Sequence, residues 1–406
     1  MTNNQLSVLP DERGRAVVWV PRAWLGKQWA TNLLLTYSKT GQILELIPDV
    51  PEKEAAQRDA RLLDGVLTPG WINAHTHLEL SALGPRELDA FAQAPGMAGF
   101  GQQLVQERLA IQPKVLLGSA RQAALVAAQQ GVAAFGDIAN SDLPAQLTAP
   151  DLPARTTFVE LLGLDRTRAQ QAWNLAQENI KRIQQAEVGP THLTLHAPYS
   201  CHPWLRQQVY RAASKPGARL SVHLLESLEE RQLFTQGTGP LAKWFLGLGW
   251  PLPPAQDPLA YLLQGLPQHT PVLWVHLTQA TAQDLQRLRN HSREAAFVLC
   301  PRSNRLLHNQ LPPVHLFQEN DRVCLGTDSL ASCPDLDIFP EMKLLNQELG
   351  APLSELFKWA TANGAEALGY GERLGQLKVG TRPRLLHLSP LSGDRLLPET
   401  QVEVLA

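Results

Sequence analysis

The amino-acid sequence predicts an α/β fold, a (β/α)8 barrel (TIM barrel) preceded by a small β-rich unit. Two patterns support this prediction. From Val66 onward, eight apolar runs of strand length alternate with amphipathic segments of helical period. Strands that are buried on both faces and separated by helices form parallel sheets. Eight such units over roughly 300 residues fit a barrel, which usually needs about 250.

Each predicted barrel strand is a continuous apolar run followed by a segment of helical period. The strands are Val66–His77, Val132–Ile138, Thr156–Leu162, Leu193–Ala197, Leu220–Leu225, Val272–His276, Ala296–Cys300 and Val323–Thr327. Helical segments are predicted before Gly131 and over Arg166–Glu187, Pro203–Ser214, Thr281–Asn290, Val314–Asn320, Phe339–Leu349 and Leu353–Leu368. The proline-rich stretch Trp250–Pro258 is expected to be an insertion loop between the fifth and sixth strands.

Residues 1–65 have a different texture. Short apolar runs at Ala16–Val20, Asn32–Tyr37 and Gln42–Ile47 are separated by proline, glycine and charged residues. This pattern predicts several short strands joined by turns rather than helices.

Composition limits the classes of partner. The chain has 406 residues, of which 44% are hydrophobic and 18% charged, enough for a sizeable core in a soluble globular protein. The formal net charge of −2 provides no basic surface for nucleic acid or an acidic membrane. We therefore expect a small-molecule substrate and no nucleic-acid or membrane partner, and leave open a homodimer.

The cysteines and the first residues predict a cytoplasmic location. Cys201, Cys300, Cys324 and Cys333 form no Cys-x-x-Cys pair and are expected to be reduced thiols. Residues 1–7 lack the basic and apolar regions of a secretory signal. No run approaches the roughly 18 apolar residues of a spanning helix.

Polar residues of one kind of chemistry gather at the predicted strand ends. His75 and His77 are two residues apart, so on a strand they project from the same face, and two imidazoles there can share a cation. The other strand-end groups are His196, His223 with Glu226 three residues later, His276 and Asp328. Barrel active sites form at the carboxyl ends of the strands. The pattern therefore predicts a metal site built from distant parts of the chain.

The remaining histidines are scattered and are expected to have surface or packing roles, since a lone histidine is usually structural. They are His192, His202, His269, His291, His308, His315 and His387. Glu160 and Trp71 are expected to be wall or core residues.

Four stretches resemble the amidohydrolase superfamily, and most closely its deaminase and chlorohydrolase branch. They are Asn73–Glu79, with His-Thr-His, then His196–Ser200, Cys300–Asn304 and Gly326–Ser332, with Gly-Thr-Asp-Ser. Together with His-Leu-Leu-Glu at residues 223–226, they are similar to aminofutalosine deaminases and adenosylhomocysteine-type deaminases. The resemblance covers essentially the whole chain. It implies a barrel over residues 66–370 and a small β-sandwich domain formed by residues 1–65 and 371–406.

The resemblance also implies a ligand set. His75, His77, His223 and Asp328 would bind one divalent metal, for which Zn²⁺ is suited and Fe²⁺ or Mn²⁺ remains open. Binuclear members of the superfamily use a lysine on the fourth strand, and Leu193–Ala197 has none, so a single-metal site is expected. The other zinc-deaminase pattern, His-x-Glu with Pro-Cys-x-x-Cys, is absent from the sequence.

The resemblance assigns roles to the remaining groups. Glu226 would move a proton from the attacking water to a ring nitrogen, His276 would hydrogen-bond the attacking oxygen, and Asp328 would relay a second proton to the leaving ammonia. For Glu226 the alternative is a solvated loop carboxylate or a helix-cap partner. Substrate contacts are expected from His196, Glu79, Arg302 and Ser329. For Glu79 a surface carboxylate, and for Arg302 a solvent-facing side chain, remain open, and Asn304 is expected only to brace its loop.

The predicted function is a metal-dependent aminohydrolase that deaminates an adenine-type nucleoside, with an aminofutalosine-like compound as the best candidate. The enzyme class is a hydrolase acting on carbon–nitrogen bonds other than peptide bonds. Two alternatives stay open: a chlorohydrolase or cyclic-amide hydrolase with the same metal site, and a non-catalytic relative that only binds.

Overall fold

The computed structural model describes residues 14–84 and 96–406, and the chain divides into two compact units. The first unit contains the chain up to Ile72, Ala127–Ala133 and Asp337–Ala406, and the second contains Asn73–Val126 and Ala134–Leu336. The predicted domain limits at residues 65/66 and 370/371 stay a prediction. Residues 1–7, from which the absence of a secretory signal was predicted, lie outside the described residues.

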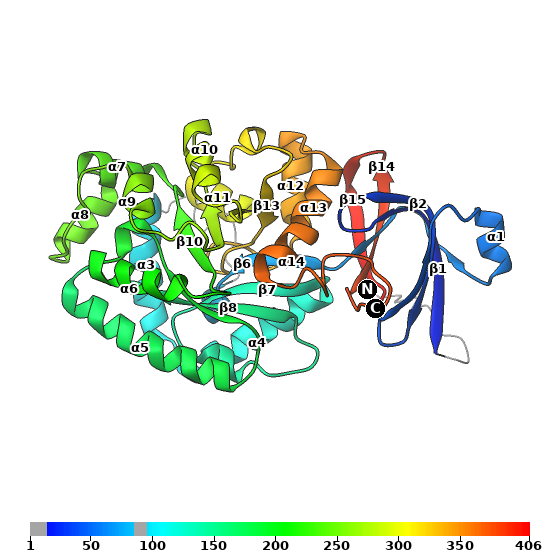
Figure 1. The fold of residues 1–406 in the computed structure, drawn as a ribbon, viewed down its shortest axis with the longest axis horizontal. Helices are drawn as coiled ribbons and strands as arrows, with labels where there is room; N and C mark the ends of the chain where they lie inside the picture. The colour runs from blue at the N-terminus through cyan, green and yellow to red at the C-terminus, as the bar shows by residue number, and fades with distance from the viewer. Residues whose placement is uncertain (1–13, 85–95) are drawn as a thin grey trace. The chain divides into compact units, whose positions relative to one another are not determined.

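Both ends of the chain contribute to the sheet of the first unit (Figure 1). It has seven strands in the order β15-β14-β5-β1-β2-β3, with β4 also paired to β1. They are β1 (Arg15–Trp24), β2 (Trp29–Ser38), β3 (Ile43–Ile47), β4 (Arg61–Leu62), β5 (Val66–Pro69), β14 (Leu385–Ser392) and β15 (Arg395–Val404). The predicted strands of residues 16–47 are confirmed in type. Whether the sheet forms a sandwich stays a prediction.

The pairing of β1 with β2 shows why this sheet forms. Val18 lies opposite Leu35 and Val20 opposite Leu33, and all four side chains are buried in one apolar cluster. Residues 1–65 were predicted to form strands and turns rather than helices. This prediction was wrong after β3, because α1 covers Glu52–Gln57. Two glutamates in its first turn interact favourably with the positive end of the helix dipole.

Three closing helices also belong to the first unit: α12 (Phe339–Leu349), α13 (Leu353–Ala360) and α14 (Ala362–Leu368). The first matches its prediction, whereas the predicted helix Leu353–Leu368 is interrupted at Thr361, whose φ and ψ are −130° and −91°. The Trp71 ring packs on Phe339 and Phe357 with centroids 6.5 and 6.0 Å apart.

The strands that carry the candidate site form two four-stranded sheets. One is β6-β7-β8-β9 and the other β10-β11-β12-β13. Their bounds are β6 (Trp71–Thr76), β7 (Val132–Ala139), β8 (Ala154–Leu161), β9 (Thr191–Leu195), β10 (Leu220–Leu224), β11 (Val272–His276), β12 (Ala296–Leu299) and β13 (Arg322–Leu325). The recorded pairs from β7 to β9 and from β10 to β13 are parallel, as predicted. Seven of the eight predicted strands are therefore present within a few residues of their expected limits. The first, Val66–His77, is divided: Val66–Pro69 is β5 in the sheet of the first unit, and only Trp71–Thr76 forms β6.

Helices separate these strands along the chain (Figure 1). They are α3 (Gly96–Ala110), α4 (Pro113–Gln129), α5 (Arg166–Gln185), α6 (Pro203–Ala213), α7 (Leu228–Gln236), α8 (Pro240–Gly247), α9 (Pro258–Leu263), α10 (Ala282–His291) and α11 (Pro301–His308), with 3₁₀ turns at Leu78–Leu83, Leu143–Gln146, Pro198–Ser200 and Val314–Leu316. The helix predicted over Val314–Asn320, after the seventh strand, was wrong. The helix at this place in the chain is α11, and the predicted segment contains only the 3₁₀ turn Val314–Leu316. Pro312 and Pro313 supply no backbone N–H there.

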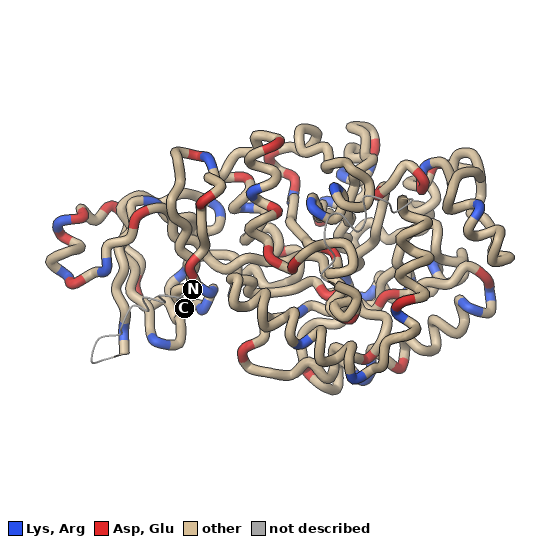
Figure 2. The backbone as a smooth tube through the Cα atoms, turned by 180° about the vertical axis from the view of Figure 1, so that it is seen from behind, with Lys and Arg blue, Asp and Glu red and all other residues tan. Residues whose placement is uncertain are grey.

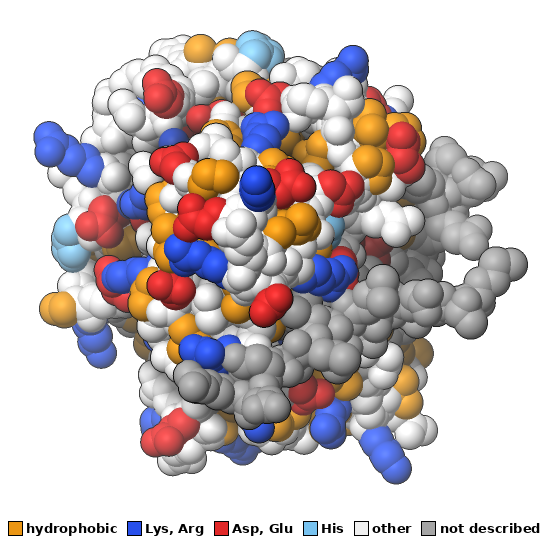
Figure 3. Space-filling model, turned by 90° about the vertical axis from the view of Figure 1, so that its right-hand side faces the viewer, with side chains coloured by type: hydrophobic (Ala, Val, Ile, Leu, Met, Phe, Trp, Pro, Cys, Tyr) orange, Lys and Arg blue, Asp and Glu red, His pale blue; other side chains and the backbone are white. Residues whose placement is uncertain are grey.

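The distribution of charge agrees with the small net charge. Figure 2 shows basic and acidic residues interspersed along the backbone, and the face in Figure 3 shows both kinds beside hydrophobic side chains where grey atoms do not cover it. All four cysteines are buried, and none forms a disulfide within the described chain. Over residues 14–84 and 96–406, no helix combines the length and apolar character needed to cross a membrane.

Candidate functional site

The site begins where β6 ends. Every residue of this strand is buried, and the rings of His75 and His77 lie with their centroids 5.0 Å apart. Gly326, after β13, lies against the same backbone: a Cβ at this position would be 2.9 Å from both the Cβ and the carbonyl oxygen of His75. The N–H groups of Thr327 and Asp328 donate to that oxygen at 3.1 Å. The missing side chain at Gly326 therefore lets β6 and the Asp328 segment come together.

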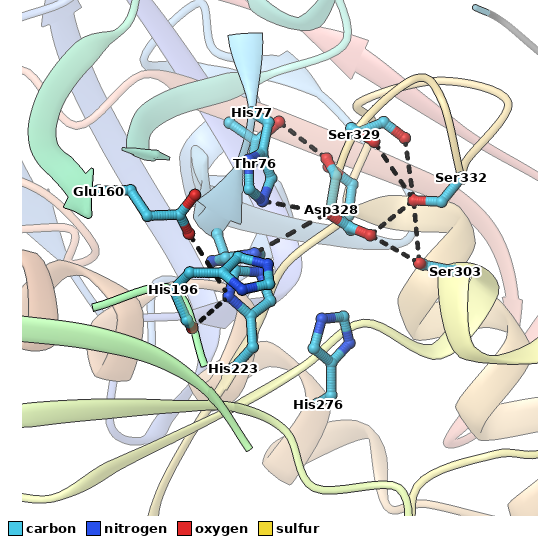
Figure 4. A network of polar contacts seen from close by, with 12 residues as sticks. Thr76, His77, Glu160, His196, His223, His276, Ser303, Asp328, Ser329 and Ser332 are labelled. Carbon is cyan, nitrogen blue, oxygen red and sulfur yellow. Dashed lines mark hydrogen bonds and ion pairs between the residues drawn. The ribbon is translucent and has the colours of Figure 1, made fainter. Parts of the chain in front are cut away.

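The four predicted metal ligands meet at this point, and Figure 4 shows three of them, His77, His223 and Asp328. His75, His77, His223 and Asp328 are buried, and each offers one ligand atom within 4.8 Å of the others. Asp328 Oδ1 lies 3.4 Å from His77 Nε2 and 3.9 Å from His75 Nε2. Residues far apart in the sequence thus present three nitrogens and one oxygen to a common centre.

The protonation and bonding of the histidines fit a cation. Both ring nitrogens of His75 are buried without a hydrogen-bond partner among the residues that the structure describes, which is costly unless another ligand satisfies them. Burial lowers the pKa of His75 well below its usual value and that of His77 to about 4, so both rings are neutral ligands at pH 7. His223 Nδ1 donates to the carbonyl oxygen of His196 at 2.9 Å and leaves Nε2 with its lone pair. The donor set therefore fits a divalent metal such as zinc.

Two serines hold Asp328 in position. The hydroxyls of Ser303 and Ser332 donate to Asp328 Oδ2 at 2.9 and 2.6 Å, while Oδ1 faces the histidines. Neither serine was assigned a role from sequence, although both lie within the stretches that resemble the superfamily. Asp328 itself has φ of 62°, in the left-handed region.

Loss of one serine hydroxyl should weaken metal binding, because hydrogen bonds that orient a ligand typically contribute about 10–100-fold in affinity. We expect Ser332→Ala to bind Zn²⁺ about 10-fold or more weakly than the wild type in a chelator competition assay. Ser214→Ala, on an exposed helix end, is the matched control. Equal affinities of Ser332→Ala and the wild type would contradict the orienting role of Ser332.

Glu226 is buried, and its carboxylate contacts two imidazoles. Oε1 lies 3.7 Å from His276 Nε2 and 3.4 Å from His308 Nε2. Burial raises the pKa of Glu226, but the two imidazoles lower it by more, to about 2. Glu226 is therefore a carboxylate at neutral pH, the form that a proton acceptor requires. The prediction of a surface or packing role for His308 missed this contact, which a four-residue spacing from Asn304 on one helix face could have indicated.

The tautomer of His276 follows from its neighbour. Asn304 Nδ2 donates to His276 Nδ1 at 3.0 Å, so the ring proton is on Nε2, the nitrogen nearer Glu226. Asn304 thus braces a histidine of the site and not only its own segment. His276 has φ of 75°, again left-handed.

Each of the four residues predicted to contact the substrate lies within hydrogen-bond distance of another side chain of the protein. His196 Nδ1 lies 2.8 Å from Ser200 Oγ, and buried Glu79 accepts a 2.7 Å bond from Ser141. Ser329 is buried, with its hydroxyl 3.4 Å from that of Ser332. The Arg302 guanidinium forms two bonds with the Asp335 carboxylate, at 2.7 and 3.1 Å.

Glu160, expected in the wall or core, lies beside the candidate centre. Its Oε1 is 3.7 Å from His223 Nδ1, and with His196 and His223 it forms a second group of possible ligand atoms (Figure 4). Asn140 donates to its Oε2 at 3.1 Å. An acidic side chain directly between apolar residues, Phe158 and Val159 before it and Leu161 after it, was the signal for this position.

Glu230 supports the turn that carries Glu226. Its Oε2 accepts the N–H of Glu226 at 3.0 Å, and burial raises its pKa from 4.5 to about 7. Between these values the folded state binds more protons than the unfolded state, so stability falls as pH rises through this window. Relative to Glu230→Gln, we expect wild-type stability to be constant below about pH 4.5, to fall by an amount on the order of 3 kcal/mol by pH 7, and then to stay constant.

Urea unfolding at pH 4, 5, 6, 7 and 8 measures this difference. Glu178→Gln, at an exposed position of α5, serves as the control and should show no pH-dependent difference from the wild type. A wild-type stability that runs parallel to that of Glu230→Gln over the whole range would refute the assignment.

A comparison with protein families matches the description "Amidohydrolase family" to residues 66–402, well over half of the chain. Among curated proteins, the chain is 27% identical over 324 residues to an aminodeoxyfutalosine deaminase of a Nitratiruptor species, covering 78% of this chain and 77% of the relative.

Two solved structures share the fold. The aminofutalosine deaminase of Helicobacter pylori, in complex with methylthio-coformycin, superposes with a TM-score of 0.75 and 22% identity over 94% of this chain and 93% of the other. An adenosine deaminase from Xanthomonas campestris with bound zinc gives a TM-score of 0.66 and 20% identity, over 92% and 84% of the two chains.

Proposed function

The chain belongs to the amidohydrolase family, and we propose that it is a metal-dependent aminohydrolase that deaminates an adenine-type nucleoside, with an aminofutalosine-like compound as the leading candidate. Its class is that of hydrolases acting on carbon–nitrogen bonds other than peptide bonds. The observation that carries the proposal is the meeting of four buried ligand residues with a buried carboxylate–imidazole pair, Glu226 and His276. The names of the similar deaminases support the choice of substrate class.

We propose a single divalent metal, Zn²⁺ in preference to Fe²⁺ or Mn²⁺. His75, His77, His223 and Asp328 would hold it, and zinc is bound in the similar adenosine deaminase. When bound, such a cation supplies Lewis acidity that brings the pKa of a water towards about 7.

The side chains around these four ligands would carry out the proton transfers of the reaction. Glu226 accepts a proton from the attacking water and delivers it to a ring nitrogen, which makes the amine-bearing carbon electrophilic. His276 Nε2–H donates to the attacking oxygen, and Asp328 takes the second proton from that oxygen and passes it to the departing amine. Water and the amino nucleoside thus yield the oxo nucleoside and ammonia.

Substrate contacts are proposed for His196, Glu79 and Ser329. Glu79, whose carboxylate already accepts from Ser141 and from the backbone of Asn140, would accept a further hydroxyl donor of a sugar. Arg302 would reach a substrate carboxylate only by leaving Asp335.

We also propose that the two four-stranded sheets close into one (β/α)8 barrel, and that residues 1–65 and 371–406 form a β-sandwich. Two contacts support closure. Thr76 and Asp328 form a parallel bridge, and Thr194 Oγ1 on β9 donates to the Ser221 carbonyl on β10 at 2.6 Å.

Ammonia release tests the function. Zinc-loaded protein is assayed for ammonia release from adenosine, 5′-substituted adenine nucleosides including aminofutalosine, guanosine, cytosine and aminotriazines, and for chloride release from a chlorotriazine. We expect release from an adenine nucleoside, with the preferred 5′ group identifying the substrate. Chloride release from a chlorotriazine, or no turnover by metal-loaded folded protein, would instead favour a different leaving group or a non-catalytic protein.

A further inference from the structure

Helix α11 contacts three of the groups that the proposed reaction uses. Ser303 donates to Asp328 Oδ2, Asn304 donates to His276 Nδ1, and His308 lies against Glu226 Oε1. Asn304 and His308 are four residues apart, so they lie on the same face of the helix. One short helix therefore touches the metal-ligand aspartate, the histidine and the glutamate.

His308 is held in place from several sides. It is the last residue of α11, and the next residue, Asn309, has φ of 50° and donates its N–H to the Arg305 carbonyl at 2.9 Å. The neighbouring Leu307 is buried in an apolar cluster. The side chains of His308 and Glu226 are each only 7% exposed. The imidazole therefore has little freedom to move away from the carboxylate.

Both recorded contacts of the Glu226 carboxylate fall on the same oxygen. His276 Nε2 and His308 Nε2 lie 3.7 and 3.4 Å from Oε1, and within the described chain no hydrogen bond or ion pair is recorded to Oε2. The terminal torsion of a glutamate is broad and nearly two-fold, so an unheld carboxylate rotates easily. Of the two imidazoles, only that of His308 is within hydrogen-bond distance of Oε1, so the His308 contact holds this rotation and leaves Oε2 to carry a proton.

We infer that His308 is a positioning residue for Glu226: it fixes Oε1 so that Oε2 faces the reacting groups. The inference rests on the proposed function for its kinetic part. Misplacement of a reacting group by about 1 Å can lower a rate on the order of 100-fold. Loss of the His308 contact should therefore lower kcat more than it changes KM, because substrate binding does not use this side chain.

His308→Gln and His308→Asn form a matched pair. The amide nitrogen of glutamine reaches the position of Nε2, whereas that of asparagine reaches only the position of Nδ1. We expect kcat of His308→Asn to fall about 10- to 100-fold with KM within about threefold, and His308→Gln to retain most of the wild-type kcat. His315→Asn, at an exposed histidine, is the control.

The effect should disappear when Glu226 can no longer transfer a proton. In a Glu226→Gln background, His308→Asn should lower the residual rate less than about threefold. Wild-type kcat for His308→Asn, equal losses in both backgrounds, or no advantage of glutamine over asparagine would each overturn the inference.

Crystal structures of the wild type and His308→Asn test the positioning without turnover. We expect the Glu226 carboxylate to rotate away from its wild-type orientation in the variant. An unchanged carboxylate, or a wild type without the His308 contact, would overturn the inference. If the wild type deaminates nothing, the proposed function fails, and these structures still decide whether His308 positions Glu226.

Discussion

Replacement of His77 by alanine is expected to remove bound metal and to lower deamination by at least about 1,000-fold, because the remaining residues cannot activate water comparably at neutral pH. His77 lies 3.4 Å from Asp328 Oδ1 at the centre of the ligand set. Metal analysis of the purified variant, together with ammonia release before and after addition of Zn²⁺, measures both effects.

His315→Ala is the control, since it removes an exposed imidazole. It should keep one metal per chain and the wild-type rate. A His77→Ala protein with stoichiometric metal and undiminished turnover would show that the metal is held elsewhere.

Glu226→Gln should retain the metal and the fold yet lose about 100- to 10,000-fold in kcat, the range over which a positioned proton carrier contributes. The amide has the shape of the carboxylate but cannot accept the proton. Because the pKa of Glu226 is held near 2, its own protonation should not limit the wild-type rate above about pH 5. Steady-state kinetics with metal analysis distinguishes loss of proton transfer from loss of metal.

Glu178→Gln is again a matched control on the surface. A Glu226→Gln enzyme with wild-type kcat would remove Glu226 from the mechanism. A variant that lacks metal would instead give Glu226 a structural role.

The sequence predicted the strand ends well, for a physical reason. Polar residues that end long apolar runs, such as His75 and Asp328, can be placed because burial of the run fixes where it stops. The sequence could not predict which residues within a strand face the site. Strands buried on both faces show no alternation of polarity, so Glu160 on β8 was taken for a wall or core residue although it lies beside His223.

The sequence also could not predict the contacts between side chains of distant segments. Helix α11 has only eight residues, and it was not predicted because its first residues belong to the stretch Cys-Pro-Arg-Ser-Asn, which was taken for a loop. His308 meets Glu226 across 82 positions of sequence, so its four-residue spacing from Asn304 indicates the helix face on which it lies but not the residue that it contacts. Ser303 and Ser332 lay within recognised stretches, but their shared acceptor, Asp328 Oδ2, is visible only once the segments are packed together.

The left-handed backbone of His276 and Asp328 has a consequence for engineering. Glycine adopts this conformation freely, whereas most other residues pay roughly 1–2 kcal/mol in it, and aspartate, asparagine and histidine adopt it more readily than the rest. Leu225 and Leu277, each next to a strand end, share it. A search for thermostable variants would therefore be drawn towards glycine at these positions. The substitutions at His276 and Asp328 would remove the groups that perform the chemistry, so selection for heat resistance alone would tend to produce sturdier but inactive proteins.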